Sequence, residues 1–161
     1  MSFIRPASFI ALSLALGVFA IACPGSEAMA QKSKAAAKIA KHRLAIQVSD
    51  NDPKLLNLAL NNVANLNSYY KSKGETVQIE VITYGPGLHM LRADTSPVKA
   101  RISSMSLELP NVTFSACQNT RDNMSKQENK PIDIISEAKT VPSGVVTLLE
   151  LQEKGFAYIR P

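Results

Sequence analysis

The sequence predicts an α/β fold, a three-layer α/β/α sandwich around a mostly parallel sheet of about five strands. Short apolar runs rich in branched side chains alternate with longer stretches whose apolar residues recur at three- and four-residue steps. The first pattern is typical of buried strands and the second of amphipathic helices. Because each intervening helix returns the chain to the same end of the sheet, the strands are expected to pair in parallel. The sequence does not reveal the strand order.

The first thirty residues have the features of a cleaved export signal. A short basic start precedes an almost uninterrupted apolar run from Phe9 to Ala22, and Ala28-Met29-Ala30 supplies the small residues that a signal peptidase recognises. The apolar run is roughly 14 residues long, short of the roughly 18 that a membrane-spanning helix needs. We therefore predict a secretory signal over residues 1–30 and an exported, periplasmic mature protein.

An alternative interpretation makes Cys23 a lipid anchor. Ala20-Ile21-Ala22-Cys23 loosely resembles a lipoprotein signal, but the leucine usually found three residues before the modified cysteine is missing. Cleavage after Ala30 is therefore preferred. Cys117 is then the one cysteine of the mature chain, and it has no partner for an internal disulfide.

The net charge of +5 resides in a short arm and not in the folded domain. Residues 31–43 are rich in alanine and lysine and carry five positive charges without an acid, which leaves residues 44–161 close to neutral. Those cations are Lys32, Lys34, Lys38, Lys41 and Arg43. We interpret the arm as a soluble tether, and membrane contact through it is not expected. The chain has no Trp and no surface that interleaves aromatic and basic residues, so nucleic-acid binding is not expected either.

Residues 44–161 are predicted to form one domain, which starts with a strand at 44–48. Asp52-Pro53 has the form of a helix start, with the carboxylate as N-cap and proline at the first helical position. The helix is expected to end near Gly74, after Lys71 and Lys73. Its apolar face is formed by Leu56, Ala59, Val63, Leu66 and Tyr70.

The remaining elements follow the same alternation. Residues 77–83 are predicted as a strand that stops at Gly85-Pro86-Gly87, and Ser96-Pro97 opens a helix that ends near Pro110. A strand over 111–117 follows, and Thr120 to Lys130 is predicted as a short polar helix or loop. The predicted elements after it are a strand-like segment at 134–141, a helix from Pro142-Ser143-Gly144 to Gly155 and a strand at 156–159.

The carboxyl ends of these strands define the candidate site, because ligands of parallel α/β sheets bind beyond those ends. Four polar, turn-prone segments are expected to converge there, and Cys117 is among them. We call this group of residues the rim. Besides Cys117, its predicted members are Asp50, Asn51, Tyr84, Gly85, Gly87, His89, Asn119, Thr120, Ser143 and Gly144.

Three common chemistries fit this rim poorly. A flavin phosphate needs glycine and hydroxyl groups after the first strand, where this chain has Asp50 and Asp52. A phosphate-accepting receiver domain needs an acid after the third strand, where this chain has Cys117. His42 and His89 lie in different segments without a second sulfur, so no metal site is predicted. No cofactor is expected.

Cys117 has two interpretations that the sequence leaves open. A buried free cysteine commonly acts as a small apolar side chain. Alternatively, a helix start near Thr120, helped by Arg121, favours the thiolate and lowers the pKa of Cys117. On this interpretation we expect the sulfur to face solvent at the sheet edge. A thiolate there can attack a sulfane donor and become a persulfide.

Several short motifs resemble those of exported members of the DsrE/DsrF-like family. They span nearly all of the chain after residue 41. The segments are His42–Pro53, Asn57–Asn62, Tyr84–Leu88, Phe114–Thr120, Val141–Val145 and Gly155–Pro161. The resemblance implies a small α/β sandwich that forms trimers or hexamers. It also implies a sulfur-relay role in which the cysteine at the end of the strand, here Cys117, carries sulfur as a persulfide.

The sequence therefore supports two functional hypotheses. In the first, the protein is a periplasmic sulfur carrier or sulfurtransferase-like protein that exchanges sulfur with a donor or acceptor protein through Cys117. No second cysteine is available to resolve the persulfide within the mature chain. In the second, the chain is a noncatalytic oligomeric binding or assembly module and Cys117 is structural. Whether it is an enzyme is not decided by the sequence.

Overall fold

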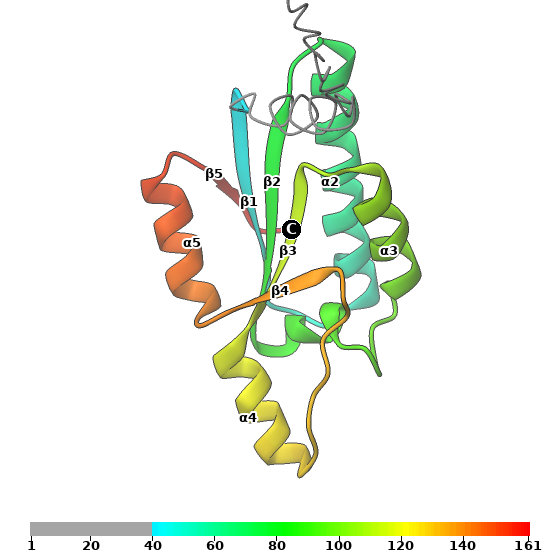
Figure 1. Ribbon diagram of the computed structural model, residues 1–161, viewed down its shortest axis with the longest axis vertical. Coiled ribbons are helices and arrows are strands. Elements are labelled where there is room, and N and C mark those ends of the chain that lie inside the picture. The colour runs from blue at the N-terminus through cyan, green and yellow to red at the C-terminus, as the bar shows by residue number, and fades with distance from the viewer. Residues whose placement is uncertain (1–39) are drawn as a thin grey trace, which may run out of the picture. The chain divides into compact units, whose positions relative to one another are not determined.

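The computed structural model describes residues 40–161, which form an α/β sandwich around one five-stranded sheet (Figure 1). The strand order is β4-β3-β2-β1-β5, and every adjacent pair is parallel. The predicted fold class is confirmed, and the sheet is parallel throughout. The predicted signal over residues 1–30 lies outside the described residues, and so does the predicted arm up to residue 39.

The first half of the sheet is built as the sequence predicts. Strand β1 (His42–Val48) leads into α2 (Pro53–Ser72), and the Asp52 carboxylate caps α2 by accepting from the Lys54 N–H at 2.9 Å. Strand β2 (Val77–Thr83) follows. Strand β1 begins two residues before the predicted strand, because His42 and Arg43 also pair with β2. The His42 ring stacks on Tyr70 with centroids 3.8 Å apart.

Two short helices differ from the predicted elements. The predicted Gly-Pro-Gly turn is the start of η2 (Gly85–Leu91), a 3₁₀ helix, and α3 covers Lys99–Glu108. Strand β3 is Val112–Cys117, and α4 (Gln118–Glu128) follows it without a loop. The helix therefore starts two residues earlier than the Thr120 start that its polar sequence suggested.

The second half of the domain supplies the two edge strands of the sheet. Strand β4 (Ala138–Val141) pairs with β3, and it is shorter than the strand-like segment predicted from residue 134. Helix α5 (Gly144–Glu153) then carries the chain to β5 (Ala157–Ile159), which pairs with β1 at the other edge.

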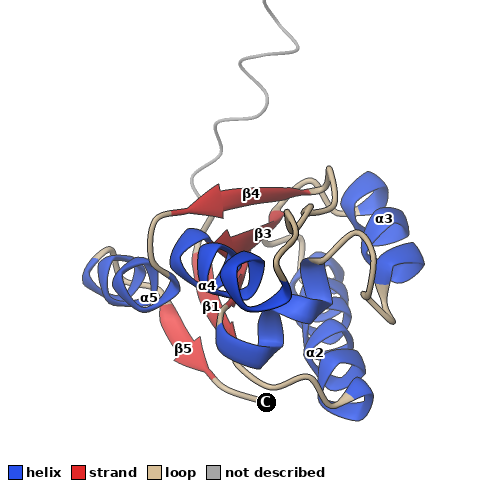
Figure 2. Cartoon of the chain, turned by 90° about the horizontal axis from the view of Figure 1, so that it is seen from below, coloured by secondary structure: helices blue, strands red, loops and turns tan. Residues whose placement is uncertain are grey.

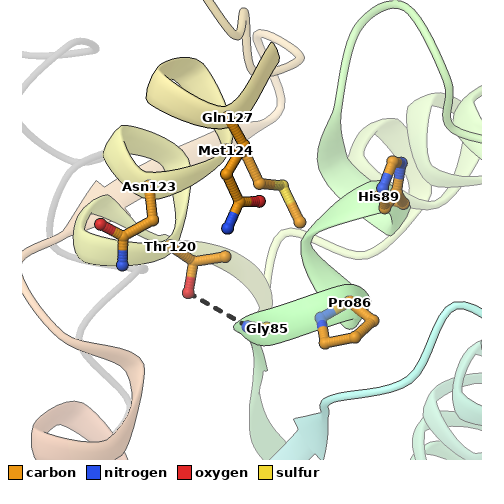
Figure 3. Close-up of a pocket in the computed structure, with 7 residues that line it drawn as sticks. All are labelled: Gly85, Pro86, His89, Thr120, Asn123, Met124 and Gln127. Carbon is orange, nitrogen blue, oxygen red and sulfur yellow. Dashed lines mark hydrogen bonds between the residues drawn. The ribbon is translucent and has the colours of Figure 1, made fainter.

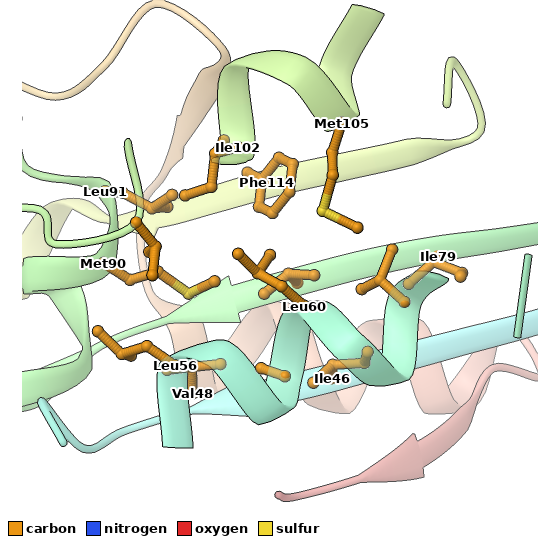
Figure 4. Close-up of a cluster of buried hydrophobic side chains, with 14 of the residues drawn as sticks. Ile46, Val48, Leu56, Leu60, Ile79, Met90, Leu91, Ile102, Met105 and Phe114 are labelled. Atoms are coloured by element: carbon orange, nitrogen blue, oxygen red, sulfur yellow. The ribbon is translucent and has the colours of Figure 1, made fainter. Parts of the chain in front are cut away.

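Helices α2 and α3 cover one face of the sheet, and α5 covers the other (Figures 1 and 2). The larger hydrophobic core lies between the sheet and the α2/α3 layer, and Phe114 and Leu60 are fully buried in it (Figure 4). A smaller cluster under α5 contains Ala45, Ile82 and Phe156. Helix α4 belongs to neither layer: it extends beyond the carboxyl ends of the strands, where the site lies (Figure 1).

Candidate functional site

The Cys117 side chain lies at the carboxyl end of β3 on the face of the sheet toward α5. Side chains alternate along a strand, and Phe114 and Ala116 belong to the core on the α2/α3 face. Cys117 has an extended backbone and is the N-cap residue of α4. Its exposed fraction is only 4%. The expectation that the sulfur faces solvent is therefore wrong, since the first turns of α4 and α5 close over it.

Four hydrogen-bond donors converge on the buried sulfur. They are the Thr120 hydroxyl and the backbone N–H groups of Gly144, Thr120 and Asn119. The Asn119 N–H also donates to the Pro142 carbonyl at 3.4 Å. Two of the N–H groups come from the first turn of α4 and one from the first residue of α5, so two helix N-termini meet at one atom. Burial is the largest influence and raises the pKa of the Cys117 thiol, but the four donors outweigh it. The net pKa is lower than that of an ordinary cysteine.

The helix start predicted to favour the thiolate is present, but Arg121 does not contribute as expected. The Arg121 side chain lies 3.9 Å from Asp122 of the same helix. The groups that lower the pKa of Cys117 are uncharged donors, three of them backbone amides. The stabilisation of a thiolate here comes from fixed dipoles and does not depend on a neighbouring cation.

Gly144 brings α5 close enough to contribute its N–H group. A Cβ atom built on Gly144 would lie 3.0 Å from Cδ1 of Tyr84 and 3.1 Å from its Cβ. Any larger residue would have to displace the Tyr84 side chain or the helix. Ser143 caps α5 through its backbone alone, and its carbonyl accepts the Thr147 hydroxyl at 2.9 Å.

Thr120 joins the sulfur to the turn after β2. Its Oγ1 accepts from the Gly85 N–H at 3.1 Å (Figure 3). Its hydroxyl donates to Cys117. Gly85 has a φ of +52°, a left-handed conformation that glycine adopts without strain. Thr120 also lines a pocket of about 370 Å³ between η2 and α4. The other lining residues are Gly85, Pro86, His89, Asn123, Met124 and Gln127.

Cys117 does not line that pocket, and Thr120 lies between the two. The pocket contains amide, imidazole and thioether groups. Burial and the nearby Arg92 lower the pKa of His89, so its imidazole is neutral at pH 7. Its Nδ1 lies 2.8 Å from the Thr95 hydroxyl.

The structure brings most residues of the predicted rim together, but not Asp50 and Asn51, which follow β1. Tyr84, Gly85, Asn119, Thr120, Ser143 and Gly144 surround Cys117 or contact its neighbours. Gly87 packs under the end of β1, where a Cβ would lie 2.3 Å from the Val48 carbonyl oxygen. Asp50 instead accepts from the Asp52 N–H at 3.0 Å, and Asn51 is exposed in the same turn before α2. Strand β1 lies two strands from β3, about 10 Å away.

Sequence reasoning missed Arg92, a charged side chain with an exposed fraction of 1%. Its guanidinium binds Asp94 and Glu128, and it lies beside the pocket-lining Met124. Nothing local in the sequence marks this residue, because Glu128 is 36 residues away.

The described residues contain no group of three or more His, Cys, Asp or Glu side chains that could hold a metal ion. Within residues 40–161 no helix is both long and apolar enough to cross a membrane. The arrangement at Cys117 is chemically suited to holding a negative charge on sulfur, because hydrogen-bond donors surround the sulfur and favour its charged form.

The fold and site define a class of small parallel α/β sandwich proteins with a thiol at the carboxyl edge of the sheet. No family model matches the sequence, and no curated protein does. A solved structure does match: MTH1491 from Methanobacterium thermoautotrophicum, described as a protein of unknown function. It is 31% identical, with a TM-score of 0.64, over 74% of this chain and 99% of that one. The chain belongs to the family of MTH1491.

Proposed function

We propose that the protein is a sulfur carrier or sulfurtransferase-like protein in which Cys117 accepts sulfur as a persulfide. The observation that supports this most is the convergence of four donors on one sulfur atom. A structural cysteine needs no such donors, since a thiol buried in hydrocarbon is a small apolar group. A persulfide acceptor must react as the thiolate, which these donors favour.

The proposed reaction balances without an external oxidant. The Cys117 thiolate attacks the terminal sulfur of a donor persulfide, R–S–S⁻, forming a new S–S bond while the donor S–S bond breaks. The donor leaves as the thiolate R–S⁻, and Cys117 carries the outer sulfur as a persulfide anion. An acceptor thiolate then attacks that outer sulfur and releases the Cys117 thiolate. The backbone donors around Cys117 stabilise this leaving thiolate in the second step.

Transfer requires that the sulfur becomes accessible, since its exposed fraction is 4% in the structure. Helix α4 is the element whose displacement would open it, because none of its residues is buried and its first turn covers the thiol. The second thiol of the pathway belongs to another molecule, since the described residues hold only Cys117. In this proposal that molecule is a donor or acceptor protein.

The wider biological setting is part of the same proposal. The resemblance to exported DsrE/DsrF-like proteins favours a periplasmic protein that assembles as a trimer or hexamer. Helix α5 carries apolar side chains on its outer side, Val145, Val146 and Leu149, that are each more than half exposed. A second copy packed on this helix would bury them. Light scattering of the wild type and Leu149→Glu tests this, and a monomeric wild type would contradict it.

Mass spectrometry of the intact protein tests the sulfur-carrier function. The protein carrying Cys23→Ser, in which Cys117 is the remaining thiol, is treated with a persulfide donor and weighed. We expect the mass to increase by one sulfur atom, and dithiothreitol to remove it. The Cys117→Ser variant is the matched control and should gain nothing. No added sulfur from either a protein or a low-molecular-weight persulfide would refute the proposal.

A second candidate, a noncatalytic binding module, is favoured by the burial of the sulfur beside an open pocket. In this alternative Cys117 holds the first turns of α4 and α5 together while the pocket and the α5 surface bind partners. Complementation of a deletion strain separates the two candidates. If the Cys117→Ala protein complements the deletion strain and the Gln127→Ala or Leu149→Glu protein does not, the result supports the binding module.

A further inference from the structure

The Arg92 side chain has an acceptor for every hydrogen it can donate. Nε and one terminal nitrogen bind the Asp94 carboxylate at 2.9 and 2.8 Å. The terminal nitrogens also bind both oxygens of Glu128, and one of them lies 3.9 Å from the sulfur of Met124. A guanidinium has five N–H groups, and these five interactions use all of them. Arg92 therefore has one fixed orientation.

The network is completed by Lys130. Its ammonium lies 3.0 Å from Asp94 and 3.3 Å from Glu128, so two cations share two carboxylates. Hydrogen bonding to Arg92 lowers the pKa of Glu128 to about 2, and the same partner lowers that of Asp94. All four groups are charged at neutral pH. We call this group, Arg92, Asp94, Glu128 and Lys130, the Arg92 clamp.

The clamp connects the turn after η2 to the last residue of α4. Arg92 is the C-cap residue of η2, and Glu128 is the final residue of α4. The segment after α4 is tied to the same turn, because the Ala93 N–H donates to the Asp133 carbonyl at 2.8 Å. The clamp therefore sets where the C-terminal half of α4 lies.

Hydrophobic packing alone does not fix α4. The helix has no buried residue, and Met124 is its one apolar side chain that packs, partly buried, on the core. Its neighbours along the polar face are exposed or half-buried. An 11-residue helix is about 16 Å long. Polar contacts hold it at both ends: the clamp at the last turn, and the contacts with Cys117, Gly85 and the Pro142 carbonyl at the first turn.

We propose that Arg92 is a positioning residue: by holding the last turn of α4 against η2, it keeps the first turn of α4 on the Cys117 sulfur. The residues positioned are Asn119 and Thr120, which supply three of the four donors to that sulfur. If the clamp is broken, α4 loses its fixed tilt, and the hydrogen bonds from these donors to the Cys117 sulfur lengthen or break. The inference rests on the proposed function only for the role of Cys117 as the reacting group.

Charged groups on the elements around Cys117 are paired with one another. Glu80 of β2 binds Lys139 of β4 at 3.0 Å, and Arg121 lies beside Asp122 on α4. Neither α4 nor α5 has an acidic residue in its first turn. The thiolate is therefore governed by donor geometry, and a change in that geometry is measurable as a change in its titration.

The test compares two Glu→Gln variants of the Cys23→Ser protein. Glu128→Gln breaks the clamp, whereas Glu153→Gln removes the last carboxylate of α5, the other helix whose N-terminus donates to Cys117. Removing a negative charge by itself favours the thiolate slightly and lowers the midpoint of its titration. Loss of donor geometry raises that midpoint. The two explanations for an effect of Glu128→Gln therefore predict opposite signs.

The measurement is the rate of iodoacetamide alkylation of Cys117 across a range of pH. We expect the midpoint to rise in Glu128→Gln, with a rate at pH 6 about threefold lower, and to stay at or just below the wild-type value in Glu153→Gln. The plateau rate at high pH separately reports access to the sulfur. Circular dichroism confirms that each variant is folded. If Glu128→Gln does not fold, Asp94→Asn replaces it, because this variant also removes a carboxylate that binds Arg92.

A midpoint in the clamp variant that equals or lies below the wild-type value would overturn the inference. Its failure is distinguishable from failure of the proposed function, because sulfur loading is measured by mass. A raised midpoint in a protein that never takes up sulfur leaves Arg92 as a positioning residue and removes the carrier function. If the wild type takes up sulfur but the midpoint of the clamp variant is unchanged, the carrier function is kept and the positioning role of Arg92 is removed.

Discussion

Replacing Thr120 by valine removes one donor from the Cys117 sulfur with almost no change in side-chain shape. The Thr120 hydroxyl donates to the sulfur and accepts from the Gly85 N–H at 3.1 Å. Valine keeps the branched shape and can do neither. Thr140→Val is the matched control, because Thr140 is an exposed residue of β4 without a side-chain hydrogen bond among the described contacts.

The expected size of the effect follows from the energy of a hydrogen bond to a charged group. Such bonds contribute about 1.5–3 kcal/mol, and we take the lower end because sulfur is a weak acceptor. About 1.4 kcal/mol lowers the thiolate fraction tenfold at a pH well below the pKa. Intrinsic nucleophilicity rises with pKa with a slope of about 0.4–0.5, which restores about threefold. The net alkylation rate at pH 6 is therefore about threefold lower.

The same reasoning predicts that the two pH profiles cross. At high pH both proteins are fully thiolate, so Thr120→Val should react about threefold faster than the wild type. The assay is the pH dependence of iodoacetamide alkylation, followed by mass. A midpoint that stays in place or falls in Thr120→Val, or a rate lower at every pH, would refute the assignment of Thr120 as a donor to the thiolate.

Two further predictions concern the scaffold. Gly87→Ala should lower the free energy of unfolding in urea by about 2–4 kcal/mol, because its Cβ would lie 2.3 Å from the Val48 carbonyl oxygen. Gly74→Asn is the control and should lower it little, since a Cβ at Gly74 meets nothing within 4 Å. Equal unfolding midpoints for the two variants would contradict this prediction. Because the pKa values of Asp94 and Glu128 are lowered in the folded state, with Glu128 at about 2, their contribution to stability is complete above about pH 5 and is lost as the pH falls toward 2. The melting temperature should therefore fall over this range less steeply in Glu128→Gln than in the wild type, and parallel curves would count against the ion pair.

Local patterns account for most of the fold because most elements carry their own start signals. Asp52-Pro53 places a carboxylate and a proline where a helix needs them, and α2 starts there. Helix α4 lacks such signals, since its sequence has no apolar face and no side-chain cap. Its position depends on Arg92 and Glu128, which are distant in the sequence. A pattern read along the chain could not place it.

The site was predicted in part for the same reason. Its thiol and the helix after it are adjacent in the sequence, so a lowered pKa for Cys117 could be argued from them. The donor from Gly144 depends on β4 lying beside β3, and the strand order is not encoded in local pattern. Asp50 and Asn51 lie apart from Cys117, because β1 and β3 are separated by β2. The burial of the sulfur resulted from α4 starting directly after β3.

The central claim is that the folded protein favours the thiolate of Cys117, and a spectroscopic titration tests it most directly. Thiolate absorbance in the ultraviolet is followed against pH for the Cys23→Ser protein, folded and in urea, and the spectrum of the Cys117→Ser variant is subtracted to remove the tyrosines. We predict that the thiol of the folded protein titrates at a lower pH than that of the unfolded chain. A folded-state midpoint at or above the unfolded one would contradict the account, because burial would then outweigh the four donors.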